Sequence, residues 1–261
     1  MERLHSDPMR NQTAVSTRES RSGRRLHGTG LLLLILVIAS FSAGQDYASI
    51  FGARYSEAEQ FLEQNSWIAD ALLLPPSETR IALAVVFPEI IRFRALEDEI
   101  QVRALKVLYV QYGKKYADFS VGPFQMKPTF AEQVEQEYNA LFSEAERSAS
   151  GIAAFETGST SKLRKERVLR LDDLQWQARY LRLFMMVMDK LYGKALFADD
   201  LDKLRFYATA YNAGFSQGEK PVRKMMEAKW FHTRLFLAAT RYNYGDVAAY
   251  YYQGHPVPAA K

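Results

Sequence analysis

The sequence predicts an all-α protein with one helical domain. Seven segments carry apolar residues at spacings of three and four, which gives a helix one apolar face. Residues 45–261, about 217 in number, are enough for one large domain with a buried core. The expected helices span 56–74, 78–87, 96–112, 129–147, 171–192, 199–212 and 222–241.

Local chemistry supports several of these boundaries. Thr129 and Glu132 have the spacing of a capping box, and Asp199 and Asp200 can cap the helix that follows them. Two segments interrupt the helices. Residues 148–162 are small, polar and glycine-containing, which predicts a mobile surface loop. Residues 116–128 alternate aromatic and polar side chains around a Gly-Pro pair, which predicts a short ordered hairpin or loop packed against helices.

The first 44 residues have the pattern of an export signal. A basic stretch ending at Arg24 and Arg25 runs into an apolar segment at 31–43. That segment is shorter than the roughly 20 residues of a spanning helix, and cleavage after Gly44 places the small Ser42 at position −3. The alternative is an uncleaved N-terminal anchor, which would be the one contact with a membrane. Both interpretations predict a periplasmic or cell-envelope protein.

Charge and cysteine content exclude several functions. Without residues 1–44, the chain has 28 basic and 27 acidic side chains, so the basic surplus lies in the export segment and we expect no nucleic-acid partner. There is no cysteine, which excludes thiol nucleophiles, thiolate metal sites and disulfides. The histidines outside the export segment, His232 and His255, do not have a metal-ligand spacing, so no metal is expected.

Glu89 is the first candidate catalytic residue. It follows an apolar run, 82–88, and precedes Ile90 and Ile91, so we expect it to be desolvated. Desolvation raises the pKa of a carboxyl and keeps it protonated near neutral pH, as a general acid must be. The alternative is a structural glutamate that pairs with Arg92 at a helix end.

The second candidate is the segment Gly122, Pro123, Phe124, Gln125 and Met126. It places an amide at a flexible turn between apolar residues. An amide donates and accepts hydrogen bonds as sugar hydroxyl and N-acetyl groups require, and aromatic faces stack on sugar rings. The alternative is a core glutamine satisfied by backbone groups.

The third candidate is Ala210, Tyr211 and Asn212, followed by Gly214 as a C-terminal helix cap. We expect the Tyr211 phenol to hydrogen-bond a carboxyl and the Asn212 amide to hold a loop. An ordinary helix end with no function explains the same residues.

Together and in this order, the three segments resemble the catalytic domain of soluble lytic transglycosylases, relatives of goose-type lysozyme. The resemblance covers residues 78–216 and implies a lysozyme-like helical domain with the 116–128 segment at its active-site cleft. In that family a glutamate is the sole acid/base, a glycine-X-X-glutamine turn lines the cleft, and an alanine-tyrosine-asparagine segment closes it. The corresponding residues here are Glu89, Gly122, Gln125, Ala210, Tyr211 and Asn212.

The resemblance implies cleavage of the β-1,4 bond between N-acetylmuramic acid and N-acetylglucosamine in peptidoglycan, with a 1,6-anhydro product and no metal or organic cofactor. Two features differ from the family pattern: Ile90 replaces a serine directly after the glutamate, and the chain between Glu89 and the turn is longer. Two alternatives stay open. One is a lysozyme-type hydrolase with Asp118 as a second carboxylate. The other is a non-catalytic glycan-binding or scaffold protein, which Ile90 favours.

Overall fold

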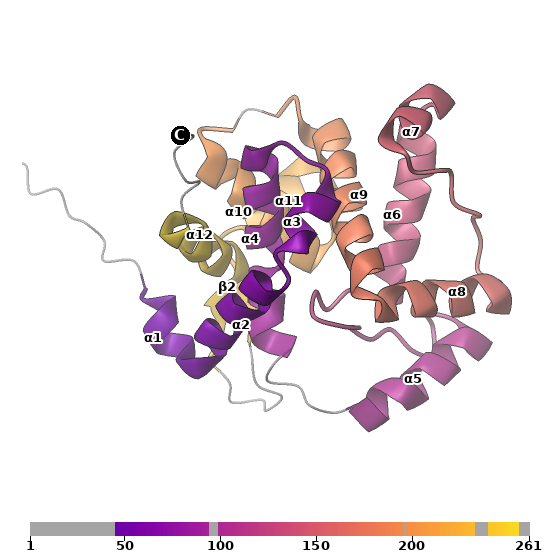
Figure 1. Ribbon diagram of the computed structural model, residues 1–261, viewed down its shortest axis with the longest axis horizontal. Coiled ribbons are helices and arrows are strands. Elements are labelled where there is room, and N and C mark those ends of the chain that lie inside the picture. The colour runs from indigo at the N-terminus through magenta and orange to yellow at the C-terminus, as the bar shows by residue number, and fades with distance from the viewer. Residues whose placement is uncertain (1–44, 94–98, 196, 233–239, 256–261) are drawn as a thin grey trace, which may run out of the picture. The chain divides into compact units, whose positions relative to one another are not determined.

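The computed structural model describes residues 45–93, 99–195, 197–232 and 240–255 (Figure 1), with the side chains of 99–102 excepted. The chain divides into two units, Met1–Gly44 and Gln45–Lys261, and every described residue belongs to the second. The expected export signal therefore lies outside the described residues, as do positions 96–98 of the predicted helix 96–112.

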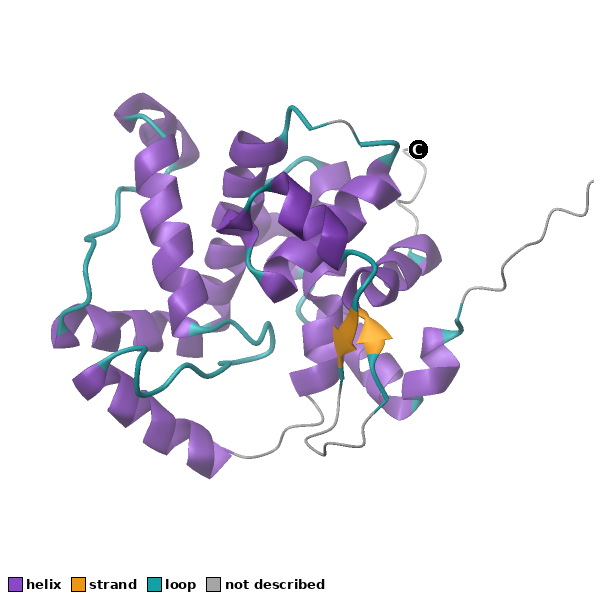
Figure 2. Cartoon of the chain, turned by 180° about the vertical axis from the view of Figure 1, so that it is seen from behind, coloured by secondary structure: helices purple, strands orange, loops and turns teal. Residues whose placement is uncertain are grey.

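Helices make up most of the regular structure (Figure 2), so the prediction of an all-α fold is confirmed. The described residues form twelve α-helices, one 3-10 helix and a two-stranded antiparallel sheet. In chain order the elements are α1 (Tyr47–Phe51), α2 (Ala53–Gln64), α3 (Trp67–Leu72), α4 (Pro76–Phe93), α5 (Glu99–Tyr112), α6 (Pro128–Leu141), α7 (Glu144–Ser150), α8 (Ser161–Asp172), α9 (Leu174–Tyr192), α10 (Asp200–Ala213), η1 (Phe215–Gln217), α11 (Glu219–Met225), β1 (Lys229–Phe231), β2 (Tyr242–Asn243) and α12 (Tyr244–Gly254).

Helix α4 lies at the centre of the core. From Ile81 to Ile91 its side chains are buried, apart from the partly buried Leu83. A helix that is apolar all round has to be covered all round, and α4 packs against α2, α3, α9, α10 and α12. Phe87 of α4 stacks on Tyr251 of α12 with ring centroids 3.9 Å apart. The N-terminal and C-terminal helices of the described unit therefore meet on one central helix.

The predicted end of this helix at residue 87 was wrong, because α4 continues through Pro88 to Phe93. Proline has no N–H, so the carbonyl of Ala84 loses its usual helical donor. Buried side chains before and after Pro88 pack against the neighbouring helices, and this packing outweighs the local cost. As a result, Glu89 lies inside the C-terminal part of a buried helix rather than beyond its end.

Three predicted helices each extend over parts of two observed helices, and in two of these three cases a capping side chain starts the second helix. Ser143 and Glu146 form a capping box that starts α7, and the Asp173 carboxylate accepts a hydrogen bond from the N–H of Gln175 at 2.8 Å and starts α9. The divided predictions are 56–74 (α2 and α3), 129–147 (α6 and α7) and 171–192 (α8 and α9).

The predicted capping box at Thr129 and Glu132 was wrong. Helix α6 begins one residue earlier, at Pro128, whose fixed φ suits the first helical position. The Thr129 hydroxyl donates instead to the carboxylate of Asp118 at 2.8 Å. Thr129 thus links the helix to the preceding loop rather than capping it.

Two other predictions about boundaries are confirmed. The Asp199 carboxylate accepts a hydrogen bond from the N–H of Asp202 at 2.8 Å and caps α10, and Gly214 ends that helix with a φ of 108°.

Residues 116–128 form an ordered turn with a buried inner side. In the predicted loop 148–162, α7 reaches Ser150 and α8 starts at Ser161, and most residues between them are exposed.

The predicted helix 222–241 was wrong at 226–232 and at 240–241, and its positions 233–239 lie outside the described residues. Helix α11 ends at Met225, and β1 then pairs with β2, where the β-favouring Trp230 and Phe231 outweigh the helical spacing. The Asn243 amide donates to the carbonyl of Ala228 at 3.3 Å, and its oxygen accepts from the N–H of Asp246 at 3.0 Å. One side chain thereby joins the hairpin to α12, a helix that the sequence analysis did not predict.

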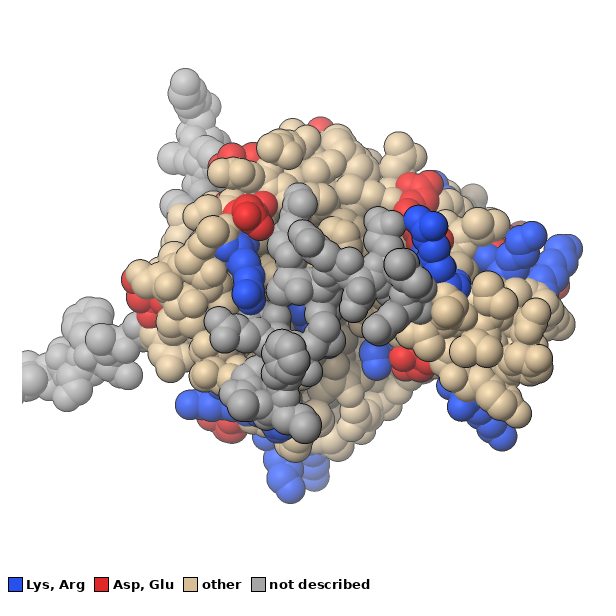
Figure 3. Space-filling view, turned by 90° about the horizontal axis from the view of Figure 1, so that it is seen from below, with Lys and Arg blue, Asp and Glu red and all other residues tan. Residues whose placement is uncertain are grey.

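The surface carries both signs of charge. On the face drawn in Figure 3, basic and acidic side chains are interspersed over the described part of the molecule, without a continuous basic area. Among the described helices, none has the length and apolar content needed to cross a bilayer.

A buried ion network holds α6, α8 and α9 together. Glu135 is 1% exposed and Arg167 is 2% exposed. The Arg167 guanidinium donates to the Glu135 carboxylate at 2.9 Å, and the Tyr180 hydroxyl and Arg170 contact the other carboxylate oxygen at 2.5 and 3.3 Å. Removing one partner from such a network leaves charge in the interior with incomplete compensation.

We expect Arg167→Met to lower the free energy of unfolding by about 3 kcal/mol, because the buried Glu135 carboxylate then loses its main partner. Chemical denaturation measures the loss. The matched control is Arg205→Met, which removes an exposed ion pair with Asp246 (3.1 Å) and should cost less than about 1 kcal/mol. Equal losses in the two variants would show that burial of the network does not increase its contribution to the free energy of unfolding.

Candidate active site

Glu89 is a buried carboxyl in the last two turns of α4, with a side chain 6% exposed. The apolar sequence around it predicts this burial, and the structure confirms it. Burial raises the pKa of the Glu89 carboxyl from 4.5 to about 7, while the charges of Arg92 and Lys127 act in the opposite direction. Desolvation therefore outweighs both cations. Near neutral pH the carboxyl is protonated and ionised in comparable amounts, as an acid/base group must be.

The contact between Glu89 and Arg92 is long. The Arg92 Nη1 lies 3.7 Å from the Glu89 Oε2, beyond hydrogen-bond distance, and the Arg92 side chain is 30% exposed. Within the described part of the chain, the Glu89 Oε2 has no hydrogen-bond partner. A buried oxygen without a partner is unusual in a structural ion pair. The long contact and the unpartnered oxygen favour a carboxyl that is not held in an ion pair with Arg92 over one that serves to stabilise the helix end.

The turn at 121–126 is held by both backbone and side chains. Val121 and Met126 exchange two backbone hydrogen bonds at 3.0 and 3.2 Å. Gly122 has a φ of 67°, and a Cβ there would lie 1.7 Å from the amide nitrogen of Gln177. Gln177 is fully buried in α9, where it accepts from the Phe124 N–H at 2.9 Å and donates to the carbonyl of Leu171 at 2.7 Å. Glycine at 122 is thus required by both conformation and space.

The side chains of this turn are not all placed as the sequence interpretation expects. Phe124 is 0% exposed and Met126 is 1% exposed, so both belong to the core and neither presents a face for a sugar ring. Gln125 has a φ of 48°, and its amide nitrogen donates to the Gly122 carbonyl at 2.9 Å. The Gln125 side chain is partly buried and braces its own turn. Phe124 and Met126 therefore anchor the turn in the core and do not form a sugar-binding surface.

Tyr211 connects the turn to α10. The prediction that its phenol hydrogen-bonds a carboxyl was wrong, because the hydroxyl donates to the backbone carbonyl of Phe124 at 2.7 Å. Burial raises the pKa of Tyr211 well above its ordinary value, and the charge of Glu89 raises it further. Helices α4 and α10 pack against each other, which brings Tyr211 within range of the Glu89 charge. The structure thus brings together α4, the 121–126 turn and the end of α10, which are far apart in sequence.

Tyr244 is a site residue that the sequence analysis missed. Its hydroxyl donates to the carbonyl of Val85 at 2.9 Å, one turn before Glu89. Burial raises the pKa of Tyr244 well above its ordinary value, and the charges of Glu89 and Tyr211 add to the effect. The three-and-four spacing of Tyr244, Val247 and Tyr251 could have identified this helix.

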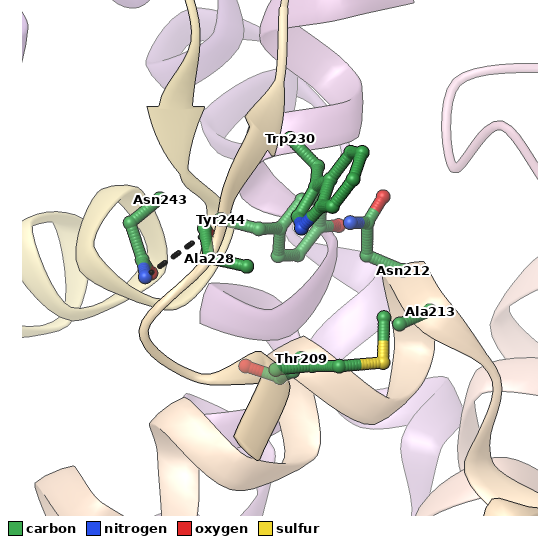
Figure 4. Close-up of a pocket in the computed structure, with 8 residues that line it drawn as sticks. Thr209, Asn212, Ala213, Ala228, Trp230, Asn243 and Tyr244 are labelled. Atoms are coloured by element: carbon green, nitrogen blue, oxygen red, sulfur yellow. Dashed lines mark hydrogen bonds between the residues drawn. The ribbon is translucent and has the colours of Figure 1, made fainter. Parts of the chain in front are cut away.

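A pocket of about 250 Å³ lies between the end of α10, β1 and the start of α12 (Figure 4). The exposed Asn212 reaches it, and Trp230, which is 62% exposed, stands over it. In Figure 4 the Asn212 amide is directed toward the phenol end of Tyr244. The remaining lining residues are Thr209, Ala213, Met225, Ala228 and Asn243.

Asp118 is placed differently from Glu89. Its carboxylate accepts a hydrogen bond from the Thr129 hydroxyl at 2.8 Å and pairs with the ammonium of Lys127 at 3.4 Å. The Asp118 side chain is 29% exposed, whereas that of Glu89 is 6% exposed. The described residues contain no group of three histidine, aspartate or glutamate side chains arranged for a metal ion.

Comparisons with protein-family models, curated proteins and solved structures found no match to this chain.

Gly122→Ala should destabilise the protein by at least about 2 kcal/mol more than Gly151→Ala, because the new Cβ displaces the buried Gln177 and its hydrogen bonds. Gly151 is a matched control: its φ is 69°, close to that of Gly122, but its Cβ would meet nothing within 4 Å. Chemical denaturation of both variants measures the difference. Similar losses would mean that backbone strain alone requires glycine at 122.

The raised pKa of Glu89 predicts how stability depends on pH. A carboxyl whose pKa is about 7 when folded and 4.5 when unfolded loses stability as the pH rises between those values, because only the folded state still holds the proton. Glu89→Gln removes this penalty. The variant should match the wild type below pH 4.5 and exceed it above pH 7, by on the order of 3 kcal/mol. Urea denaturation across this pH range tests the effect, and a variant less stable than the wild type at pH 8 would contradict it.

Proposed function

We propose that this protein is a peptidoglycan lytic transglycosylase with Glu89 as its sole acid/base. The observation that carries the proposal is the Glu89 carboxyl, which is buried, lacks a hydrogen-bond partner for its Oε2 within the described residues and has a pKa of about 7. Near neutral pH such a group can give a proton to a leaving oxygen and take one back. The order of the three segments in the sequence supports the same family and a lysozyme-like arrangement of the helices.

In the proposed reaction, the protonated Glu89 donates its proton to the glycosidic oxygen between N-acetylmuramic acid and N-acetylglucosamine. The C1–O bond breaks, and the substrate's own N-acetyl group stabilises the oxocarbenium-like centre. The Glu89 carboxylate then takes the proton of the C6 hydroxyl, whose oxygen bonds to C1 and forms the 1,6-anhydro ring. Protons balance, because Glu89 ends protonated as it began. The attack is intramolecular, which replaces a captured water by a high effective concentration.

The environments of the carboxylates favour one acid/base over two. Asp118 is partly exposed, paired with Lys127 and hydrogen-bonded by Thr129, and these contacts serve the loop that precedes α6. A hydrolase would use such a second carboxylate to activate water and would release a reducing end instead of an anhydro end. Ile90, which replaces the family's serine, is fully buried in the core. The scaffold alternative corresponds to glycan binding without release of soluble products.

The substrate and the location are parts of the same proposal. Peptidoglycan strands lie outside the cytoplasm. Within residues 1–44, a basic stretch is followed by an apolar segment and then by small residues, and this order supports export to the periplasm or cell envelope. The proposed chemistry requires neither a metal nor an organic cofactor.

Glu89→Gln should abolish release of anhydro-muropeptides from purified peptidoglycan, a loss of at least about a hundredfold, because glutamine can neither donate nor recover the proton. For the wild type, kcat/KM should fall about tenfold per pH unit above pH 7, as the acid form of Glu89 is lost. Mass spectrometry of the released fragments measures both effects and separates anhydro from reducing ends.

Circular dichroism of the same preparations provides the control, since the variant should keep its helical signal. A folded Glu89→Gln protein with full activity would end the transglycosylase proposal. Reducing ends alone would favour the hydrolase, and binding without products from the wild type would favour the scaffold.

A further inference from the structure

The pocket beneath Trp230 combines an exposed aromatic ring with polar and apolar lining residues. Trp230 keeps 62% of its surface exposed although it lies in a strand, and burying this ring in a complex removes a large apolar area from water. The ring is oriented on the protein before any ligand arrives, because its strand pairs with β2 and the guanidinium of Arg241 lies 5.9 Å from the ring centroid.

Two polar side chains of the pocket, Asn243 and Tyr244, bond to the protein, and a third, Asn212, is exposed. Asn243 donates to the Ala228 carbonyl and accepts from the N–H of Asp246, and the Tyr244 hydroxyl donates to the Val85 carbonyl. Both therefore serve the fold. Asn212 is exposed, and its amide is directed into the pocket (Figure 4). An amide that both donates and accepts matches the N–H and C=O of an acetamido group.

The floor of the pocket adds apolar contact. Met225, Ala213 and Ala228 line it, and such side chains suit a methyl group and the C–H face of a sugar ring. At about 250 Å³ the pocket is smaller than the roughly 300–1,000 Å³ typical of drug-sized ligands, so its capacity corresponds to one ring rather than an oligomer.

We propose that this pocket is a subsite for one N-acetylhexosamine ring of a glycan strand, stacked on Trp230 and hydrogen-bonded by the Asn212 amide. The Tyr244 side chain lines this pocket, and its hydroxyl donates to the carbonyl of Val85, one helical turn before Glu89, so the subsite lies near the acid/base. This inference rests on the proposed function, because it extends the same glycan site from the cleaved bond to a neighbouring sugar.

The test uses the β-1,4-linked tetramer of N-acetylglucosamine as the probe and isothermal titration calorimetry as the readout. Binding is measured on the Glu89→Gln protein, which should not consume the probe. Adding Trp230→Ala should weaken the affinity by about tenfold or more, as expected for loss of an aromatic anchor. Trp230→Phe should keep much of the affinity. Trp67→Ala is the matched control, since Trp67 is 36% exposed on α3 and lies outside this pocket.

Each outcome decides between the proposals. Absence of tetramer binding to the Glu89→Gln protein, unchanged affinity in Trp230→Ala, or an equal loss in Trp67→Ala would each overturn the subsite. If the wild type releases anhydro products while Trp230→Ala keeps its affinity and KM, the subsite fails and the transglycosylase function stands. If Trp230→Ala loses affinity while the wild type releases nothing, the subsite stands and the proposed function fails.

Discussion

The structure depends on the burial of α4. Its side chains are apolar from Ile81 to Ile91 with the exception of Glu89, so the hydrophobic effect surrounds this helix with α2, α3, α9, α10 and α12 and takes the one carboxyl into the interior with it. The same packing keeps the helix intact through Pro88. A charge at such a position is costly, and the group responds by holding its proton to a higher pH. Core formation and the chemistry of Glu89 therefore have one physical cause.

Hydrogen bonds to backbone carbonyls fix the surroundings of that carboxyl. The Tyr211 hydroxyl holds the carbonyl of Phe124, and the Tyr244 hydroxyl holds the carbonyl of Val85. Both phenols are buried, and their pKa values lie well above the ordinary value, so they remain neutral donors. Gln177 adds a third link by bonding to the turn on one side and to the carbonyl of Leu171 on the other. Neutral groups thus position the segments without adding a charge that would ionise Glu89.

Much of this arrangement could be predicted from the sequence, and the exceptions have identifiable causes. The helical class, the cap at Asp199 and the burial of Glu89 follow from local pattern, because spacing and apolar neighbours determine them. The continuation of α4 past Pro88 and the hairpin before α12 depend on tertiary packing. Local helix and strand propensities do not include such packing. Phe124 was expected to stack on a sugar but lies in the core. The sequence does not distinguish the two positions, because an aromatic residue after a Gly-Pro pair occurs in both buried and exposed turns. The position of Tyr244 beside Glu89 follows from the docking of α12, which lies 159 residues from Val85.

The hydrogen bond between Tyr244 and Val85 also has a consequence for when the raised pKa arises during folding. Helix α12 is the last helix of the described chain, and without it one side of α4 is open to water. In that state we expect Glu89 to be hydrated and to titrate near the ordinary value of a glutamate. A chain without α12 should thus carry an ionised Glu89 near neutral pH, where the chain with α12 docked holds the proton on about half of its molecules. Docking of α12 therefore brings this group to its final protonation state.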